Sequence, residues 1–234
     1  MNARIWMSGP ISLTLVMATT QSFAVTLSDI TSSLSDNAEA VDDLTADVVV
    51  DSSDNTFDVL DAEFQLKRMT TPYNKFRIEE TAGGVRCDGA EVASGPNLSQ
   101  FSTWCTAADS FIGWISMSTR DTDILWLIDN NTFTLATGTF TINSITCRKI
   151  ESAGYTIYVN DSNHAKVVRI DALSNNTVDR RYDFDGYSYI ESEAYIPDTV
   201  NASRPNLASE PTYEITYSNI NINENLSDSL FDIP

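Results

Sequence analysis

Residues 63–89 run EFQLKRMTTPYNKFRIEETAGGVRCDG, and this stretch carries the pattern that decides the fold. Polar and apolar residues alternate on both sides of Pro72, which indicates two strands separated by a turn. The Asp88-Gly89 pair at its end is a strong hairpin signal. The stretch therefore predicts consecutive antiparallel strands that form a sheet wall, and it holds no grouping of side chains typical of an active site.

Upstream of this stretch, apolar residues spaced three and four apart predict an amphipathic helix over Ser28–Leu44, with Ser28 or Asp29 as N-cap. The region around Asn97–Leu127 is ambiguous, and a short helix is expected at Leu98–Ala108 or at Asp121–Asn130. Pro197–Pro211 holds three prolines and is expected to be a long polar loop.

Elsewhere the hydrophobic period is two, with polar turns such as Ser174–Asn176 between the apolar runs. Such spacing indicates an antiparallel meander, and thus an α+β domain that is mainly antiparallel β. The strands are expected at Thr45–Val50, Thr56–Leu66, Asn74–Thr81, Val85–Cys87, Glu91–Ala93, Thr139–Lys149, Tyr155–Asn160, Lys166–Asp171, Thr177–Phe184, Tyr187–Glu193 and Thr212–Asn219.

The first 24 residues have the layout of a secretory signal peptide. A short start with one basic residue precedes the apolar run Ile5–Ala18, and Ser22-Phe23-Ala24 places small residues at a cleavage site. A membrane anchor or a buried helix is the alternative, but the run is too short and too polar to span a bilayer comfortably. We expect cleavage after Ala24, export to the periplasm, and a single domain over residues 25–234.

The formal net charge of −19 argues against nucleic acid or an anionic membrane surface as a direct partner. The acids are spread along the chain, most densely over residues 42–61. An acidic surface that keeps the protein soluble explains this balance, and attraction of a basic partner is the alternative.

Catalysis and metal binding are not expected. The only histidine, His164, lies in an expected turn with no nucleophile-elbow glycines nearby, and a metal site would need several soft or imidazole ligands. Acids are so abundant that no carboxylate pair stands out. Cys87, Cys105 and Cys147 are too few for a disulfide scaffold, and which pair is bridged, if any, stays open. We therefore expect no enzyme, no metal and no cofactor.

Large apolar side chains repeat on alternate strand positions, and three tryptophans lie between the two groups of strands. Periodicity alone favours a core filled by these side chains, although a curved sheet of many strands can also hold a ligand in its mouth. If a ligand cavity exists, its expected lining is Phe64, Leu66, Phe76, Ile78, Trp104, Trp114, Trp126, Tyr155, Ile157, Tyr213, Ile215 and Tyr217.

Four segments together resemble a known family. PYNKFRIE at Pro72–Glu79, followed by VRCDG at Val85–Gly89, resembles the Lys-Phe-Arg and Asp-Gly segment of the periplasmic outer-membrane lipoprotein-sorting (LolA-like) proteins. Val41–Val50 is similar to the part of that family's chain that leads from the first helix to the first strand. Ile190–Pro197 is similar to a late strand of the family, and Tyr213–Pro234 is similar to its last strand and closing Phe-x-x-Pro. The aromatic that usually follows Asp-Gly is replaced by Ala90-Glu91-Val92-Ala93.

The resemblance implies a half-open curved β-barrel with an N-terminal helix and short lid helices. It implies a carrier that binds acyl chains of lipoproteins or other lipids for transport to the outer membrane, with inner- and outer-membrane lipoprotein transport components as partners. It also implies that Arg77 helps to hold and open the lid. An envelope sensor with the same fold, or an exported interaction domain that binds no lipid, are the alternatives.

Overall fold

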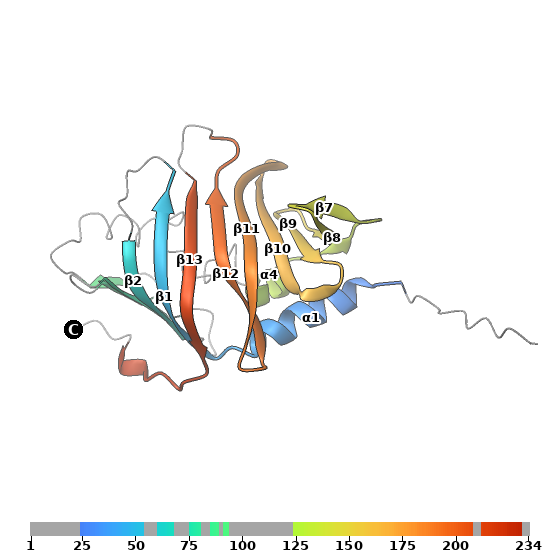
Figure 1. The fold of residues 1–234 in the computed structure, drawn as a ribbon. Coiled ribbons are helices and arrows are strands. Elements are labelled where there is room, and N and C mark those ends of the chain that lie inside the picture. Colours follow the sequence, from blue (N-terminus) through green and yellow to red (C-terminus); the bar gives the residue numbers. More distant parts are fainter. Residues whose placement is uncertain are drawn as a thin grey trace, which may run out of the picture.

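One antiparallel sheet of 13 strands forms the body of the protein (Figure 1). The structure, a computed structural model, describes residues 24–53, 60–67, 75–80, 85–88, 91–93, 124–207 and 212–230, and between 60 and 93 it describes the backbone only. The strands are β1 Asp43–Ser52, β2 Leu60–Lys67, β3 Lys75–Glu80, β4 Val85–Asp88, β5 Glu91–Ala93, β6 Thr134–Leu135, β7 Phe140–Ile142, β8 Ile145–Glu151, β9 Tyr155–Asn160, β10 Asn163–Ser174, β11 Thr177–Ile190, β12 Ala194–Ser203 and β13 Tyr213–Ile222.

The sheet is curved and open. Its strand order is β5-β4-β3-β2-β1-β13-β12-β11-β10-β9-β8-β6, with β7 paired beside β8. The last strand of the chain thus pairs with the first, and the path ends at β5 and β6 without joining them, so the sheet does not close within the described residues. The expected fold class, mainly antiparallel β in a half-open curved barrel with an N-terminal helix, is confirmed.

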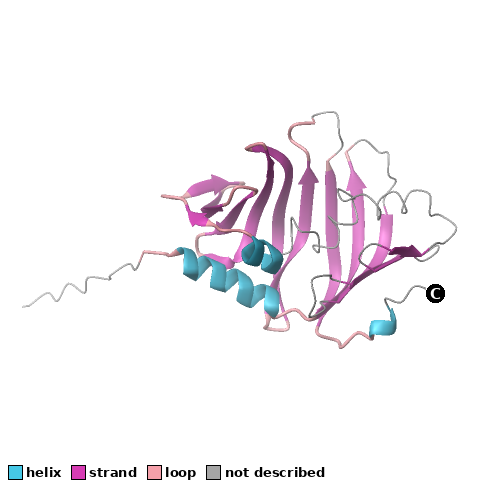
Figure 2. Ribbon diagram, turned by 180° about the vertical axis from the view of Figure 1, so that it is seen from behind, coloured by secondary structure: helices cyan, strands magenta, loops and turns pink. Residues whose placement is uncertain are grey.

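In the described part of the chain, two helices cover one face of this sheet. α1 (Leu27–Glu39) packs against β10, β12 and α4 (Ile124–Asn130), and Figure 2 shows both helices on the same side of the strands. We call this side the inner face and the opposite side the outer face. A short 3-10 helix, η1 (Asp228–Leu230), follows the last strand. No helix in the described ranges has both the length and the apolar character needed to cross a membrane.

The start of α1 differs from the expectation. Thr26, rather than Ser28 or Asp29, is the N-cap, because its hydroxyl accepts a hydrogen bond from the Asp29 backbone N–H while the Asp29 carboxylate accepts one from the Thr26 N–H. The Asp29 carboxylate also accepts a hydrogen bond from the Thr26 hydroxyl at 2.7 Å, and this bond, together with the one from the Thr26 N–H, lowers the pKa of Asp29. The helix ends at Glu39, and β1 begins at Asp43. The expected span to Leu44 was too long, because Val41 and Leu44 continue the apolar pattern from the loop and the strand.

Several expected strand boundaries were wrong. Thr139–Lys149 is two strands, β7 and β8, joined by a tight turn in which Asn143 and Ser144 both have positive φ, of 48° and 67°. The two strands expected between residues 177 and 193 are the single strand β11. His164 lies within β10 rather than in a turn. The Ser174–Asn176 turn is confirmed, with positive φ at both asparagines.

Pro197 lies inside a strand, where a loop was expected. β12 pairs with β11 along most of its length, and there Pro197 lies opposite Tyr187. β12 pairs with β13 only over Thr199–Ala202. At Pro197 the strand therefore has a partner on one side only, so the missing N–H of proline removes no ladder bond on the other side.

A buried aspartate ties the C-terminal segment to the start of the sheet. Asp43 is 3% exposed, and its carboxylate accepts hydrogen bonds from the backbone N–H of Glu224 at 2.7 Å and of Leu226 at 2.8 Å. Asn223 adds a second tie, because its side-chain oxygen accepts from the Asp42 N–H and its amide donates to the Ala40 carbonyl. These bonds hold residues 223–226 against the loop between α1 and β1.

We predict that Gly186→Ala destabilises the protein by about 1–2 kcal/mol. Gly186 has φ +63° within β11, and an added Cβ would lie 3.1 Å from the Asp198 Cβ. Gly154→Ala is the matched control, since a Cβ there would meet nothing within 4 Å. Urea unfolding of both variants measures the difference. Equal stabilities would show that the bend at Gly186 tolerates a side chain.

Candidate functional site

The inner face of the sheet is a continuous apolar surface. Ile30 and Leu34 of α1 and Leu127 of α4 are 2% exposed or less and belong to one core cluster with the inner residues of the strands. The cluster continues past the helices onto the two strands at the centre of the sheet. The buried strand residues there are Leu44, Ala46, Val48, Ile215, Tyr217 and Ile222.

Exposure divides the predicted lining residues into two groups. Ile157 and Ile215 are 0% exposed and Tyr217 is 3% exposed, so in this conformation they are core residues. Trp126, Tyr155 and Tyr213 are half-buried and pack against the same cluster. The rings of Trp126 on α4 and Tyr155 on β9 meet edge to face at 6.4 Å. Among the candidates whose side chains the structure describes, these three offer surface to a ligand without rearrangement.

Two tyrosines of this cluster have raised pKa values. Burial raises the pKa of Tyr217 well above its usual range. Burial also raises the pKa of Tyr187, whose hydroxyl donates to the Val167 carbonyl at 2.6 Å. The surroundings therefore disfavour charge, as a site for an uncharged apolar ligand requires.

Strand register relates the candidates on β2 and β3 to this face. Leu66 pairs with Leu44 and Phe64 with Ala46, and both partners are buried on the inner face. Phe76 pairs with Leu66 and Ile78 with Phe64. Paired residues share a face in an antiparallel sheet, so all four predicted positions are in phase with the core. Trp104 and Trp114 lie outside the described residues.

Arg77 alternates with Phe76 and Ile78 along β3 and so belongs to the opposite face of the sheet. It pairs with Gln65 on β2 and with Arg86 on β4, and Gln65 in turn pairs with Thr45, which is out of phase with the buried Leu44 and Ala46. The register thus assigns Arg77 to the outer face. It does not bring Arg77 together with α1 or α4, and the gating role of Arg77 stays a prediction.

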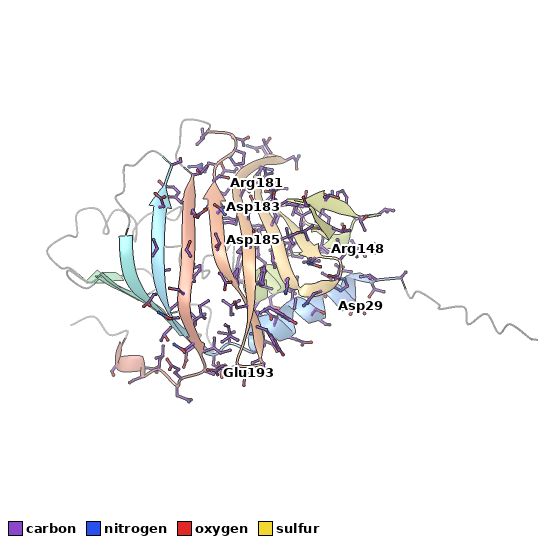
Figure 3. The ribbon with its side chains drawn as sticks, in the orientation of Figure 1. Asp29, Arg148, Arg181, Asp183, Asp185 and Glu193 are labelled. Carbon is purple, nitrogen blue, oxygen red and sulfur yellow. The ribbon has the colours of Figure 1, made fainter. Side chains whose placement is uncertain are left out.

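The sequence reasoning missed an ion-pair network on the outer face. Arg169 on β10 contacts Asp183 on β11 at 2.6 Å, and Arg181 on β11 contacts Asp171 on β10 at 2.7 Å and 3.1 Å. Figure 3 labels Arg181 and Asp183. Asp171 is 4% exposed, and hydrogen bonding to it raises the pKa of Arg181. The sequence Arg-x-Asp occurs at both 169–171 and 181–183, within two strands that were expected to be neighbours. This repeated pattern could have predicted the ion pairs.

Cys147 is free and buried in a small cluster on the outer side of β8. Burial raises the pKa of its thiol, which therefore stays protonated and weakly reactive. In the described part of the chain, His, Cys, Asp and Glu form no grouping of three that could hold a metal ion.

The comparisons with known proteins identify the fold. No protein-family model matches the sequence, and no curated protein does. Solved structures match as well, among them three that are covered over most of their length. A DUF1329 family protein from Desulfovibrio piger matches with TM-score 0.62 and 14% identity, covering 87% of this chain and 95% of that one.

The other two carry the name of the resembled family. A putative outer membrane lipoprotein-sorting protein domain from Vibrio parahaemolyticus has TM-score 0.59 and 8% identity, covering 86% of this chain and 95% of that one. A LolA superfamily protein from Nitrosomonas europaea has TM-score 0.59 and 16% identity, covering 89% and 98%. At these identities the likeness concerns the fold: the chain has the open, curved sheet of the LolA-like proteins.

Proposed function

We propose that this protein is a periplasmic carrier that binds acyl chains of lipoproteins or other lipids on its inner face, for transport toward the outer membrane. The observation that carries the proposal is the extent of the apolar inner face. It runs from β8 beneath the helices to β13 and β1, and the sheet that bears it is open. The proposal includes removal of residues 1–24 and a single carrier domain over residues 25–234.

Burial of acyl chain on this face supplies enough free energy. Each methylene removed from water contributes about 0.8 kcal/mol, so one long chain yields on the order of 10 kcal/mol before the cost of association. Because Ile215 and Tyr217 are already covered, a chain that reaches them must displace what covers them. We therefore expect uptake to begin at the half-buried Trp126, Tyr155 and Tyr213.

A titration with a fluorescent fatty acid tests this proposal. We expect saturable binding, and we expect Tyr213→Ser to weaken it about tenfold because an aromatic ring on the ligand path is lost. Tyr189→Ser is the matched control, since Tyr189 is 53% exposed near the end of β11 and outside the inner core cluster. Equal loss in both variants, or no saturable binding by the parent protein, would contradict the proposal.

The gating role of Arg77 has a separate test. If Arg77 acts on the lid, Arg77→Leu should leave the unfolding midpoint unchanged and alter the rate at which bound fatty acid is released to an acceptor vesicle. A stopped-flow release measurement provides that rate. An unchanged rate removes Arg77 from the gating mechanism and agrees with its outer-face register.

A further inference from the structure

Two arginines lie at one end of the apolar inner face. Arg180 on β11 is two residues before the buried Tyr182 of the inner core cluster, so the alternation of the strand assigns Arg180 to the inner face. It pairs with Ala172 on β10, which is 3% exposed. Arg204 directly follows β12, and its Nη2 donates to the Asp179 carboxylate at 3.1 Å. The Arg180 Nε lies 3.8 Å from the same carboxylate, so Asp179 holds the two guanidiniums near each other. We call Arg180 and Arg204 the arginine pair.

Tyr155 lies on one side of the arginine pair. Ala172 pairs with Arg180 on β11 and, across its other edge, with Tyr155 on β9, so the three residues share one row of the inner face. Two strand spacings separate the backbones of Arg180 and Tyr155 by about 10 Å. Trp126 extends this side, because its ring meets that of Tyr155 edge to face at 6.4 Å.

Tyr213 lies on the other side. Ala202 on β12 pairs with Tyr182 on β11 and with Tyr213 on β13, and this row is the next inner row after that of Arg180. Two strand spacings and one inner repeat place the backbones of Arg180 and Tyr213 about 12 Å apart. Figure 1 shows the start of β11 and the end of β12 side by side at the upper end of the sheet. The arginine pair therefore lies between the half-buried aromatics at which we expect uptake to begin.

The chemistry of the arginine pair suits an oxyanion. A guanidinium is planar and carries five N–H donors, and it binds a carboxylate or a phosphate through two parallel hydrogen bonds. The side chains of Arg180 and Arg204 are 21% and 24% exposed, so each can be reached from solvent although most of it is covered. Hydrogen bonds to a charged group are stronger in such surroundings than on an open surface.

We infer that the arginine pair binds the anionic headgroup, a carboxylate or a phosphate, of an amphiphile whose acyl chain lies on the inner face. This inference rests on the proposed function, and it narrows the cargo to lipids that carry an oxyanion. The uncharged chain lies along the apolar core, while the headgroup stays at the partly exposed end of the sheet. The net charge of −19 does not forbid this, because at physiological ionic strength charges farther than about 8 Å are largely screened.

Displacement of N-phenyl-1-naphthylamine, an uncharged apolar dye, tests the inference on the purified protein. The competitors are dodecanoate, dodecyl phosphate and dodecanol, which share one chain length and differ in the headgroup. We expect the better of the two anions to displace the dye at about one tenth of the concentration that dodecanol requires, as charge-assisted hydrogen bonds in a partly exposed site provide. The order of the two anions tells a carboxylate from a phosphate ligand.

Variants assign the preference to the arginine pair. Arg180→Gln/Arg204→Gln should reduce the preference for the anion to less than about twofold and leave displacement by dodecanol unchanged. Lys149→Gln/Lys166→Gln removes the same charge from β8 and β10 and should keep the preference. Asp179→Asn removes a negative charge beside the pair and should strengthen binding of the anion about threefold, a gain that a loss of folding cannot produce.

The contrary results separate this inference from the carrier function. Equal displacement by the anions and by dodecanol would overturn the headgroup site and leave an apolar carrier standing. A protein that binds neither the dye nor a fluorescent fatty acid would remove both. Equal loss of preference in the two double variants would mean that overall charge, and not the arginine pair, selects the anion.

Discussion

Ile215→Asp is expected to lower the free energy of unfolding by about 4 kcal/mol or more, enough to unfold a protein of ordinary stability. Ile215 is 0% exposed at the centre of the sheet, where β13 pairs with β1 on one side and β12 on the other. An aspartate there would bury a carboxylate among apolar side chains, and that cost adds to the lost packing. Circular dichroism and urea unfolding measure the change.

Thr216→Asp is the control for this prediction. Thr216 is exposed on the outer face, one position along the same strand. The same carboxylate there remains in water, and we expect a loss under about 1 kcal/mol. If the two variants were equally stable, the division of β13 into an apolar inner and a polar outer face would be wrong. The placement of the ligand surface would then be wrong as well.

Asp171→Ala is expected to cost about 2–3 kcal/mol, because it leaves the Arg181 guanidinium without its bidentate partner. The Asp171 side chain is 5% exposed and that of Arg181 is 28% exposed, so water compensates only part of the loss. Glu151→Ala is the matched control. It breaks the contact with Lys149 at 2.8 Å, but the Glu151 side chain is 44% exposed, and exposed pairs contribute under about 1 kcal/mol.

Unfolding in guanidinium chloride would mask ion pairs, so urea is the denaturant for this comparison. Equal losses for Asp171→Ala and Glu151→Ala would mean that the outer-face network is as weak as an ordinary surface pair.

The alternation of residue types was sufficient to predict the sheet. Tyr213, Ile215 and Tyr217 lie on the inner face while Glu214, Thr216 and Ser218 are exposed, as the period of two predicts. The loop expected from Pro197 onward was wrong. A proline normally excludes a central strand, and only the strand pairing shows that β12 has no second neighbouring strand at Pro197. Such pairing depends on residues far apart in the sequence.

The candidate site was predictable as a face but not as a set of contacts. Alternation identifies Ile157 and Tyr155 as residues of one face, but it gives no sign that Ile157 is fully covered and Tyr155 is not. Burial of this kind depends on how helices pack across the sheet.

Native mass spectrometry of the protein purified from the cells that produce it tests the proposed carrier function most directly. The account predicts a mass that exceeds that of residues 25–234 by a bound lipid or acyl chain, and predicts that collisional activation releases this mass. A clean apo mass, together with no uptake of a fluorescent fatty acid, would contradict it.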